Sequence, residues 1–189
     1  MIRIFDIFFS SLGLFFLSPV LVIIFIIGWL ENGDPIFKQE RVGLYKKPFF
    51  IFKFRTMKLD TDILATHLID SSAVTDFGRI LRKNKLDELP QLWNVLLGEM
   101  SIVGPRPCLF NQTKLINERD FNNVFNVPPG ITGLSQLEGI DMSRPKLLAK
   151  TDAKMIKNLN FINYFRYIFL TILGQGSGDK VKTETFKKR

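Results

Sequence analysis

The sequence predicts a mainly helical α+β protein with a small β-hairpin, an N-terminal membrane helix and amphipathic helices at the membrane interface. Three observations lead to this fold class. Residues 7–29 contain no charged side chain, and residues 36–57 alternate short apolar stretches with Gly, Pro and basic residues. Residues 146–173 have a helical pattern that is first polar and then aromatic. We expect a membrane helix over residues 1–32, followed by one interfacial domain over residues 33–189.

The composition points to an anionic partner and excludes several kinds of site. The 189-residue chain carries a formal net charge of +8, which suits contact with nucleic acid, a phosphorylated metabolite or an acidic membrane surface. Charge alone does not choose among these three. The single cysteine, Cys108, excludes an internal disulfide and a multi-cysteine zinc site, and the single histidine, His67, excludes most histidine-based sites. We therefore expect a reducing cytoplasmic environment.

The N-terminal apolar run is long enough to cross about 30 Å of hydrocarbon as a straight helix. It is longer than the apolar part of a signal peptide and lacks a small-residue cleavage site, so we interpret it as a permanent membrane segment. Ser18 and Pro19 interrupt its middle, where a proline kinks or breaks the helix. Two topologies remain open: a kinked helix that spans the bilayer, or a re-entrant helix that returns to the face it entered. Arg3 and the basic body favour the cytoplasmic side for both flanks.

Turn-forming residues at 31–35 are predicted to end this membrane segment. The stretch that follows predicts a hairpin with its loop near Gly43, and Lys53 and Arg55 give one edge of it a basic character. Residues 60–75 are rich in Thr, Asp and Ser and predict a loop.

Two short helices are expected next. Asp76 is of the residue type that caps a helix, and the apolar pattern after it continues to about residue 85. A second helix is predicted over residues 88–97, ending at Gly98. Pro90 lacks only a donor that the first helical turn leaves unused, so it belongs near the start of this helix, with Asp87 at the cap.

The rest of the chain divides into a loop-rich middle and a helical end. Prolines and glycines between residues 105 and 133 predict loops, which carry function when a rigid scaffold holds them. The helical pattern then continues to residue 173, where Lys157, Tyr164 and Arg166 fit an interfacial helix as well as a core helix. The basic tail from Gly174 is expected to fray.

The adjacent carboxylates of Asp87 and Glu88 are the strongest chemical signal. They follow a cluster of basic residues and precede Arg106. A paired acid in a basic setting can hold a nucleophile and a metal ligand side by side, as chemistry on a phosphate requires. The structural alternative is a capping Asp followed by a Glu that the helix dipole favours. The spacing fits both interpretations.

Three cationic side chains are candidates for binding phosphate. Arg82 precedes Asp87 by five residues, and Lys53 lies in the predicted hairpin. Arg106 stands between two prolines that restrict its backbone. Lys53 could instead guard an edge strand, and Arg82 could face solvent or anionic lipid. Bidentate recognition of phosphate is the functional interpretation of the arginines. The Pro-Gly-Ile-Thr-Gly motif at residues 129–133 is either an ordinary turn or a source of backbone N–H groups for a diphosphate.

Taken in order, these segments resemble one protein family. The motifs that carry the resemblance are Ser18-Pro19, Lys-Phe-Arg-Thr-Met at 53–57, Leu-Asp-Glu-Leu-Pro-Gln-Leu at 86–92, Asn-Val-Leu at 94–96, Met-Ser-Ile-Val-Gly-Pro-Arg-Pro at 100–107 and Pro-Gly-Ile-Thr-Gly at 129–133. They are similar to those of the small monotopic phosphoglycosyl transferases, in the bacterial sugar transferase family. The likeness covers nearly the whole chain.

The resemblance implies an enzyme that transfers a sugar 1-phosphate from a nucleotide sugar, usually a UDP-sugar, to a polyprenyl phosphate such as undecaprenyl phosphate. UMP would be released. Asp87 would be the nucleophile that forms a covalent aspartyl phosphosugar intermediate, and Glu88 would bind Mg²⁺. The residues implied to form or support the substrate-binding site are Lys53, Arg82, Arg106 and Asp152.

The resemblance also implies a location and partners. The Ser18-Pro19 break makes the helix of this family re-entrant, so we expect a monotopic protein on the cytoplasmic face of a bacterial inner membrane, with residues 33–189 as its catalytic domain. The expected partners are the nucleotide sugar, the polyprenyl phosphate and membrane lipid, without nucleic acid. A homodimer is compatible with exposed aromatic helices. The reaction would be the first membrane step in making a surface glycan or glycoprotein.

Two departures from the family pattern concern the donor contacts. Many members carry Arg before the Pro-Gly-Ile-Thr-Gly motif and Trp after it, where this chain has Pro128 and Leu134. An arginine that some relatives carry near Ile140 is also absent. The dyad and Arg106 are retained, so the expected reaction type is unchanged. The alternative from another functional class is a non-enzymatic membrane adaptor whose basic face binds acidic lipid or nucleic acid.

Overall fold

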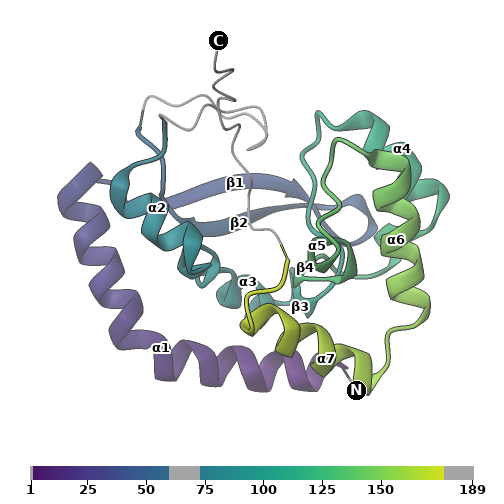
Figure 1. The fold of residues 1–189 in the computed structure, drawn as a ribbon, viewed down its shortest axis with the longest axis horizontal. Coiled ribbons are helices and arrows are strands. Elements are labelled where there is room, and N and C mark those ends of the chain that lie inside the picture. The colour runs from purple at the N-terminus through teal and green to yellow at the C-terminus, as the bar shows by residue number, and fades with distance from the viewer. Residues whose placement is uncertain (1, 60–72, 177–189) are drawn as a thin grey trace, which may run out of the picture.

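The computed structural model describes residues 2–59 and 73–176, and it confirms the predicted fold class. Figure 1 shows the long helix α1 (Ile2–Asn32) along the edge of a body made of shorter helices and short strands. The described residues form two two-stranded sheets within that body. Most of the loop expected over residues 60–75, and the tail beyond residue 176, lie outside the described residues.

Helix α1 is bent and largely exposed. Pro19 lies inside it, and Figure 1 shows two arms that meet at a sharp bend. The Ser18 hydroxyl donates a hydrogen bond of 2.7 Å to the Phe15 carbonyl, within the turn that precedes the proline. The helix is long and apolar enough to cross a membrane, and only 11% of its most apolar window is buried inside the fold. The predicted apolar membrane segment is therefore a single helix with a break in its middle.

Polar side chains fasten the first arm of α1 to the body. Asp6 is 2% exposed although it lies in an apolar helix. Its Oδ1 accepts three hydrogen bonds, from the Ser101 hydroxyl, the Ile102 N–H and the Tyr164 hydroxyl. The Arg3 guanidinium donates to the Val95 and Leu96 carbonyls in the last turn of α3 (Gln91–Leu97), where few intrahelical donors remain.

The predicted hairpin is present as β1 (Ile36–Val42) and β2 (Pro48–Phe54), which pair antiparallel. A short 3₁₀ turn, η1 (Leu44–Lys46), joins the two strands. Asn94 of α3 completes the open edge of β2, because its side-chain amide donates to the Phe50 carbonyl at 2.7 Å and its Oδ1 accepts from the Phe52 N–H at 3.1 Å. These bonds hold the hairpin against α3.

Helix α2 (Asp76–Lys83) begins at Asp76, the residue that was predicted to be its N-cap. The N-cap is Thr75, whose hydroxyl accepts from the Gly78 N–H at 2.9 Å, and Asp76 lies in the first turn. A Cβ on Gly78 would lie 2.2 Å from the Thr56 carbonyl oxygen, so the helix packs directly on the backbone that follows β2.

The prediction of one helix over residues 88–97, capped by Asp87, is wrong. Leu86–Glu88 form a separate 3₁₀ turn, η4, and α3 starts at Gln91 with Pro90 in the cap position. The reason lies in Lys85, which adopts a left-handed conformation (φ 56°) and redirects the chain after α2 before a helix can resume. The predicted end is correct, since Gly98 closes α3 with a φ of 90°.

The parallel strands β3 (Ser101–Val103) and β4 (Gly130–Thr132) form the second sheet. A Cβ on Gly130 would lie 2.0 Å from the Gly104 backbone nitrogen, so only glycine permits this approach. The chain between the strands is not all loop, because it contains α4 (Thr113–Phe121) and the 3₁₀ turn η5 (Val124–Asn126). The loop-rich prediction missed α4 because its apolar residues form no clear helical stripe.

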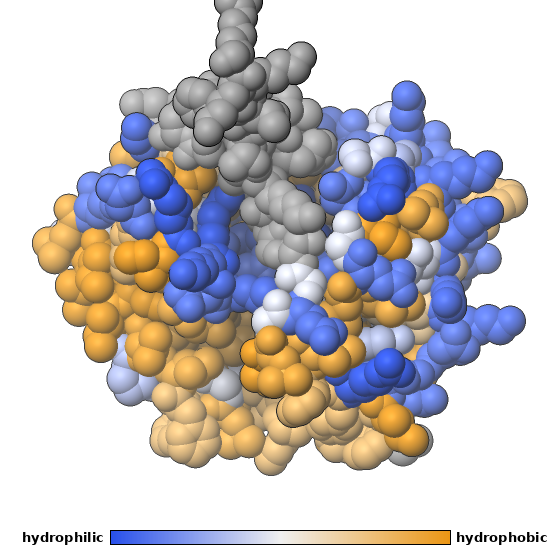
Figure 2. All heavy atoms as spheres, viewed as in Figure 1, coloured by the Kyte–Doolittle hydropathy of each residue, from blue (hydrophilic) through white to orange (hydrophobic). Residues whose placement is uncertain are grey.

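The predicted helical end is present with one break. A single turn, α5 (Leu134–Leu137), precedes α6 (Pro145–Lys157) and α7 (Phe161–Ile172). Helix α7 packs along the first arm of α1, where Phe5 makes edge-to-face contacts with Phe161 and Phe165. Large apolar side chains stay exposed beside this contact, among them Phe8, Phe16, Ile162, Phe169 and Ile172. Figure 2 shows apolar surface along the edge that α1 and α7 form.

Candidate active site

The two carboxylates of the dyad lie in η4, between α2 and α3. Glu88 Oε1 accepts from Lys53 Nζ at 2.9 Å and from Arg106 Nη2 at 2.7 Å. The structure thus brings together a strand residue of the hairpin, the dyad and the proline-flanked arginine after β3. The Lys53 and Glu88 side chains are 9% and 13% exposed, so solvent screens this pair only weakly.

Asp87 lies beside Glu88 in the same turn and is 5% exposed. The turn is constrained on its N-terminal side, because a left-handed conformation at Lys85 is unfavourable for a residue with a side chain. Lys85 Nζ donates to the Gln175 carbonyl at 2.9 Å, which brings the segment after α7 next to the turn. The dyad is therefore presented by a tight turn and not by the first turn of a long helix.

Arg82 approaches the dyad from α2, which packs against η4. Its Nε donates to the Thr56 hydroxyl at 2.8 Å. Its Nη1 is buried and has no hydrogen-bond partner within residues 2–59 and 73–176. A buried guanidinium nitrogen without a partner is costly, so this donor is well suited to an anionic ligand.

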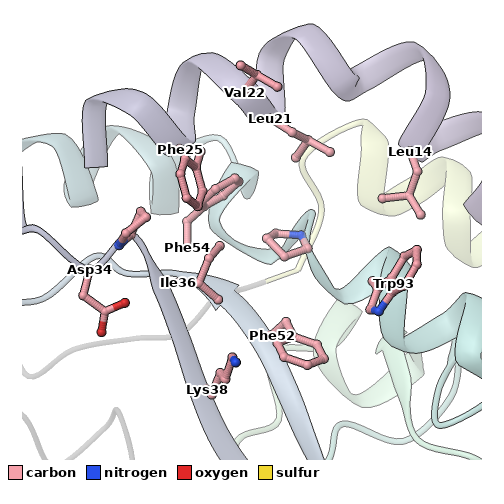
Figure 3. Close-up of a pocket in the computed structure, with 12 residues that line it drawn as sticks. Leu14, Leu21, Val22, Phe25, Asp34, Ile36, Lys38, Phe52, Phe54 and Trp93 are labelled. Carbon is pink, nitrogen blue, oxygen red and sulfur yellow. The ribbon is translucent and has the colours of Figure 1, made fainter. Parts of the chain in front are cut away.

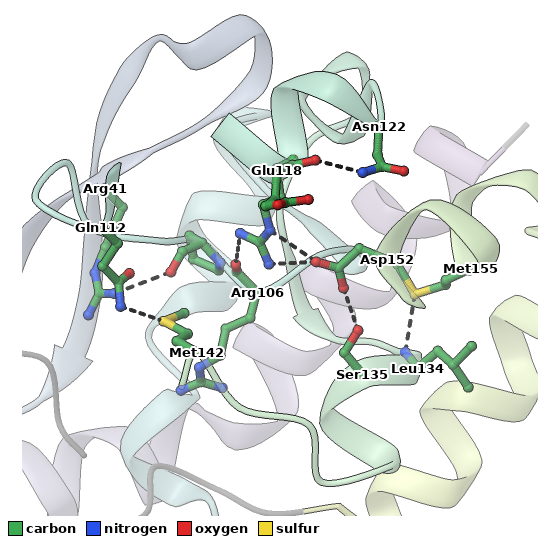
Figure 4. Close-up of polar contacts among 12 residues, drawn as sticks. Arg41, Arg106, Gln112, Glu118, Asn122, Leu134, Ser135, Met142, Asp152 and Met155 are labelled. Atoms are coloured by element: carbon green, nitrogen blue, oxygen red, sulfur yellow. Dashed lines mark hydrogen bonds and ion pairs between the residues drawn. The ribbon is translucent and has the colours of Figure 1, made fainter. Parts of the chain in front are cut away.

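Asp152 is 1% exposed and does not join the cluster around Glu88. Its Oδ2 accepts from Arg119 Nε at 3.0 Å and Nη2 at 2.7 Å, and its Oδ1 accepts from the Ser135 hydroxyl (Figure 4). Arg119 also donates from Nη1 to the Arg106 carbonyl at 2.8 Å. Asp152 is thus connected to the site only indirectly, because it binds Arg119, which in turn donates to the Arg106 carbonyl. No pattern in the sequence points to Arg119, because a lone arginine in a polar stretch is usually solvated.

The departures from the family pattern have structural roles in this chain. Leu134 packs beside Tyr167, and its N–H lies 3.1 Å from Met155 Sδ. Ile140 packs against the core cluster that contains Cys108 and Leu148. Burial raises the pKa of the Cys108 thiol, which keeps it protonated and a poor nucleophile. Cys108 is therefore a structural residue.

Two hollows flank the dyad segment. A cavity of about 380 Å³ is lined by Glu88 and Arg106 together with residues of β4 and α7. An apolar groove of about 630 Å³ lies under α1 on the other side, with Pro90 and Trp93 in its wall. Figure 3 shows Leu14 of α1 above Trp93 at one end of this groove, and Phe25 of α1 beside Phe54 at the other. Within this segment Glu88 and Leu89 line the partly polar cavity, and Pro90 lines the apolar groove that adjoins the membrane helix.

The donor set fits a magnesium ion only if the substrate contributes ligands. The described residues contain no group of three or more His, Cys, Asp or Glu side chains that could hold a metal. Mg²⁺ is commonly bound through one or two carboxylates plus substrate phosphates and water. Glu88, with Asp87 beside it, matches that mode.

The bacterial sugar transferase family matches residues 1–176. The chain belongs to this family. The uncharacterized sugar transferase EpsL of Bacillus subtilis is 40% identical over 144 residues, which are 76% of this chain and 71% of that protein. The exopolysaccharide production protein PSS of Rhizobium leguminosarum bv. phaseoli is 35% identical over 190 residues, with 92% and 94% of the two chains covered.

Relatives whose names state a reaction are longer proteins. The UDP-glucose:undecaprenyl-phosphate glucose-1-phosphate transferase of Klebsiella pneumoniae is 40% identical over 144 residues, which are 72% of this chain but 30% of that enzyme. The Escherichia coli K12 enzyme of the same name is 35% identical over 178 residues, covering 88% and 38%. The chain thus corresponds to the smaller part of each. Membership of the family identifies the chain as a transferase enzyme, which confirms that prediction.

Proposed function

We propose that this sugar transferase moves a sugar 1-phosphate from a UDP-sugar to undecaprenyl phosphate through a covalent intermediate on Asp87. The observation that carries the proposal is the buried Asp87 next to Glu88, whose Oε1 accepts from Lys53 and Arg106. A carboxylate can act as a nucleophile, and cations beside it can stabilise phosphate charge during the displacement. The reactions named for the Klebsiella and Escherichia coli relatives support the choice of donor and acceptor.

In the first half-reaction, a carboxylate oxygen of Asp87 attacks the β-phosphorus of the UDP-sugar. The new bond is an acyl phosphate, and the bond to the bridging oxygen breaks, so that UMP leaves with the electron pair. Negative charge grows on the leaving oxygen. Arg106 and Lys53 lie at Glu88, and Arg82 offers its unpaired Nη1, so these cations are placed to stabilise that charge.

In the second half-reaction, a phosphate oxygen of the lipid acceptor attacks the same phosphorus. The acyl phosphate bond breaks and returns Asp87 as a free carboxylate, leaving a polyprenyl diphosphate sugar. The apolar groove that ends at Pro90 offers the polyprenyl chain a path from the membrane helix to the dyad. Because both substrates react at one phosphorus, UMP must leave before the acceptor phosphate arrives.

Glu88 would hold a magnesium ion, which would neutralise charge on the donor phosphates. Glu88 is suited to this because its position is fixed from two sides by Lys53 and Arg106. Those two cations would also hold Glu88 in place before the donor binds.

We further propose that α1 is re-entrant and that the body lies on the cytoplasmic face. The Asp6 and Arg3 hydrogen bonds hold the first arm to β3, α3 and α7, while the second arm leads into β1. A spanning helix would have to place these two attachments on opposite sides of a bilayer. A cysteine introduced at residue 2 should react with a membrane-impermeant thiol reagent only from the cytoplasmic side. Labelling from the outer side alone would establish the spanning topology.

Release of UMP tests the reaction. The full chain, in bilayer nanodiscs, is incubated with undecaprenyl phosphate and each of a panel of UDP-sugars. Asp87→Asn should abolish UMP release, and Asp76→Asn, whose carboxylate is 93% exposed on α2, should leave it unchanged. Wild-type UMP release by Asp87→Asn would refute the proposal. A protein that binds acidic lipid or DNA with strong salt dependence but releases no UMP would instead be an adaptor.

A further inference from the structure

A second polar cleft lies between α6 and α7. Its volume is about 660 Å³, and its walls come from α5, the last turn of α6, the connection at residues 158–160 and one face of α7. None of the proposed reaction residues lines it. The proposed transfer reaction therefore gives this cleft no role.

Three cations line the cleft: Lys154, Lys157 and Arg166. All three are exposed, and none makes an ion pair or a side-chain hydrogen bond within the part of the chain that the structure describes. Glu138 is the one carboxylate among the lining residues. Three positive charges against one negative charge make the cleft attractive to an anion.

The two lysines have a structural explanation that the arginine lacks. Lys154 and Lys157 stand in the last turn of α6, where cations stabilise the negative end of the helix dipole. Arg166 is in the middle of α7, so no helix end accounts for it. It faces the cleft across from the lysines although its own helix is otherwise mostly apolar.

The N-terminal end of α7 opens into the same cleft. Asn160 caps this helix by accepting from the Asn163 N–H at 2.9 Å, and both asparagines line the cleft. The first N–H groups of a helix carry partial positive charge and favour bound anions. Amide donors thus reinforce the charge of the three cations.

The neighbouring surface indicates where the anion comes from. Phe161, Ile162 and Phe169 of α7 are 59%, 74% and 61% exposed, next to the apolar first arm of α1. In Figure 2 hydrophilic surface adjoins this apolar edge. Arg166 lies one helical turn from Ile162 and from Phe169, so it borders the apolar face of α7. When that face enters a bilayer, a basic residue at its border stands among the lipid headgroups.

We propose that the cleft between α6 and α7 binds the phosphate headgroup of an anionic phospholipid, held by Lys154, Lys157 and Arg166. The bound lipid would fix the tilt of α7 at the membrane surface. The site is independent of the transfer reaction, so either proposal can fail alone.

Native mass spectrometry of the full chain, released from nanodiscs of mixed phosphatidylcholine and phosphatidylglycerol, measures which lipid is retained. Wild type should retain phosphatidylglycerol preferentially. The triple variant K154Q/K157Q/R166Q should lose this preference, by roughly 100-fold in relative affinity if each cation acts as a basic residue does at an anionic surface. The matched control K114Q/K146Q/K150Q removes the same charge from exposed sites outside the cleft and should keep the preference.

The same preparations separate the outcomes. UMP release by the triple variant in detergent should equal that of wild type, because these residues lie outside the reaction site. Equal loss of lipid preference in both triple variants would make it an effect of net charge and overturn the proposal. Retention of the preference by K154Q/K157Q/R166Q would overturn it as well. Displacement of the lipid by inorganic phosphate alone would identify a soluble-anion site instead.

Discussion

The buried Arg119–Asp152 pair supports Arg106, and its removal should have a large effect. The two side chains are 2% and 1% exposed and share a bidentate contact. Substituting Asp152→Asn leaves the Arg119 guanidinium charged and buried without its counterion. Breaking a buried pair on one side costs about 3–5 kcal/mol. For a protein of this size each kcal/mol lowers Tm by about 2–4 °C, so we expect a fall of roughly 6–20 °C.

Thermal unfolding of the full chain in one detergent measures this change. The matched control is Asp120→Asn, next to Arg119 on α4, whose carboxylate is 54% exposed and pairs with an exposed lysine. Exposed pairs contribute about 0–1 kcal/mol, so the control should shift Tm only slightly. Equal shifts in the two variants would refute the claim that Asp152 is held in a buried network.

A double variant separates stability from positioning. Replacing Arg119→Met together with Asp152→Leu removes both charges, which is often neutral or stabilising in a core. Tm should therefore recover relative to Asp152→Asn. UMP release should stay low, because the Arg106 carbonyl has lost the 2.8 Å donor from Arg119. Recovery of both properties would show that Arg119 and Asp152 serve the fold alone.

Three further outcomes follow from the structure. Mg²⁺ alone should not raise Tm, whereas Mg²⁺ with a UDP-sugar should, and chelation should stop UMP release; a Tm rise with Mg²⁺ alone would indicate a protein-only metal site. Burial, and next the hydrogen bond to Asp6, raises the pKa of Tyr164 in the folded protein above the ordinary value of 10.0. The contribution of Tyr164 to the free energy of unfolding is therefore complete below pH 10.0 and is lost as the pH rises above 10.0. Tyr164→Phe should lack that alkaline loss in unfolding free energy, and an identical pH profile would contradict this. Cys108 should react with a thiol reagent only when the protein unfolds, and rapid labelling of the folded chain would show that its environment is open.

Local patterns in the sequence predicted much of the fold. The alternation in residues 36–57 produces the hairpin, and Gly98 ends α3 where a left-handed residue is needed. These features depend on a few neighbouring residues, which is why they can be read directly. The spacing of Asp87 and Glu88 fits a helix cap as well as a reactive pair, and the order of the motifs around them favours the second interpretation.

Other features depend on contacts between distant parts of the chain. The 3₁₀ turn around Asp87 exists because Lys85 takes a left-handed conformation and its ammonium reaches Gln175. Burial of Asp6 requires partners from β3 and α7 that no local pattern reveals. Arg119 becomes a buried support of Arg106 only when α4 packs against α6. Tertiary contacts of this kind override the local helix propensity and the usual solvent exposure of charged side chains.

The central claim is that Asp87 becomes covalently attached to the sugar phosphate. Intact-protein mass spectrometry after rapid mixing with a UDP-sugar, in the absence of lipid acceptor, tests it directly. We expect a mass increase of one sugar phosphate, located on Asp87, absent from Asp87→Asn and removed by undecaprenyl phosphate. UMP formation only when donor and acceptor are both present, with no adduct at any time, would mean direct transfer and would contradict a covalent intermediate.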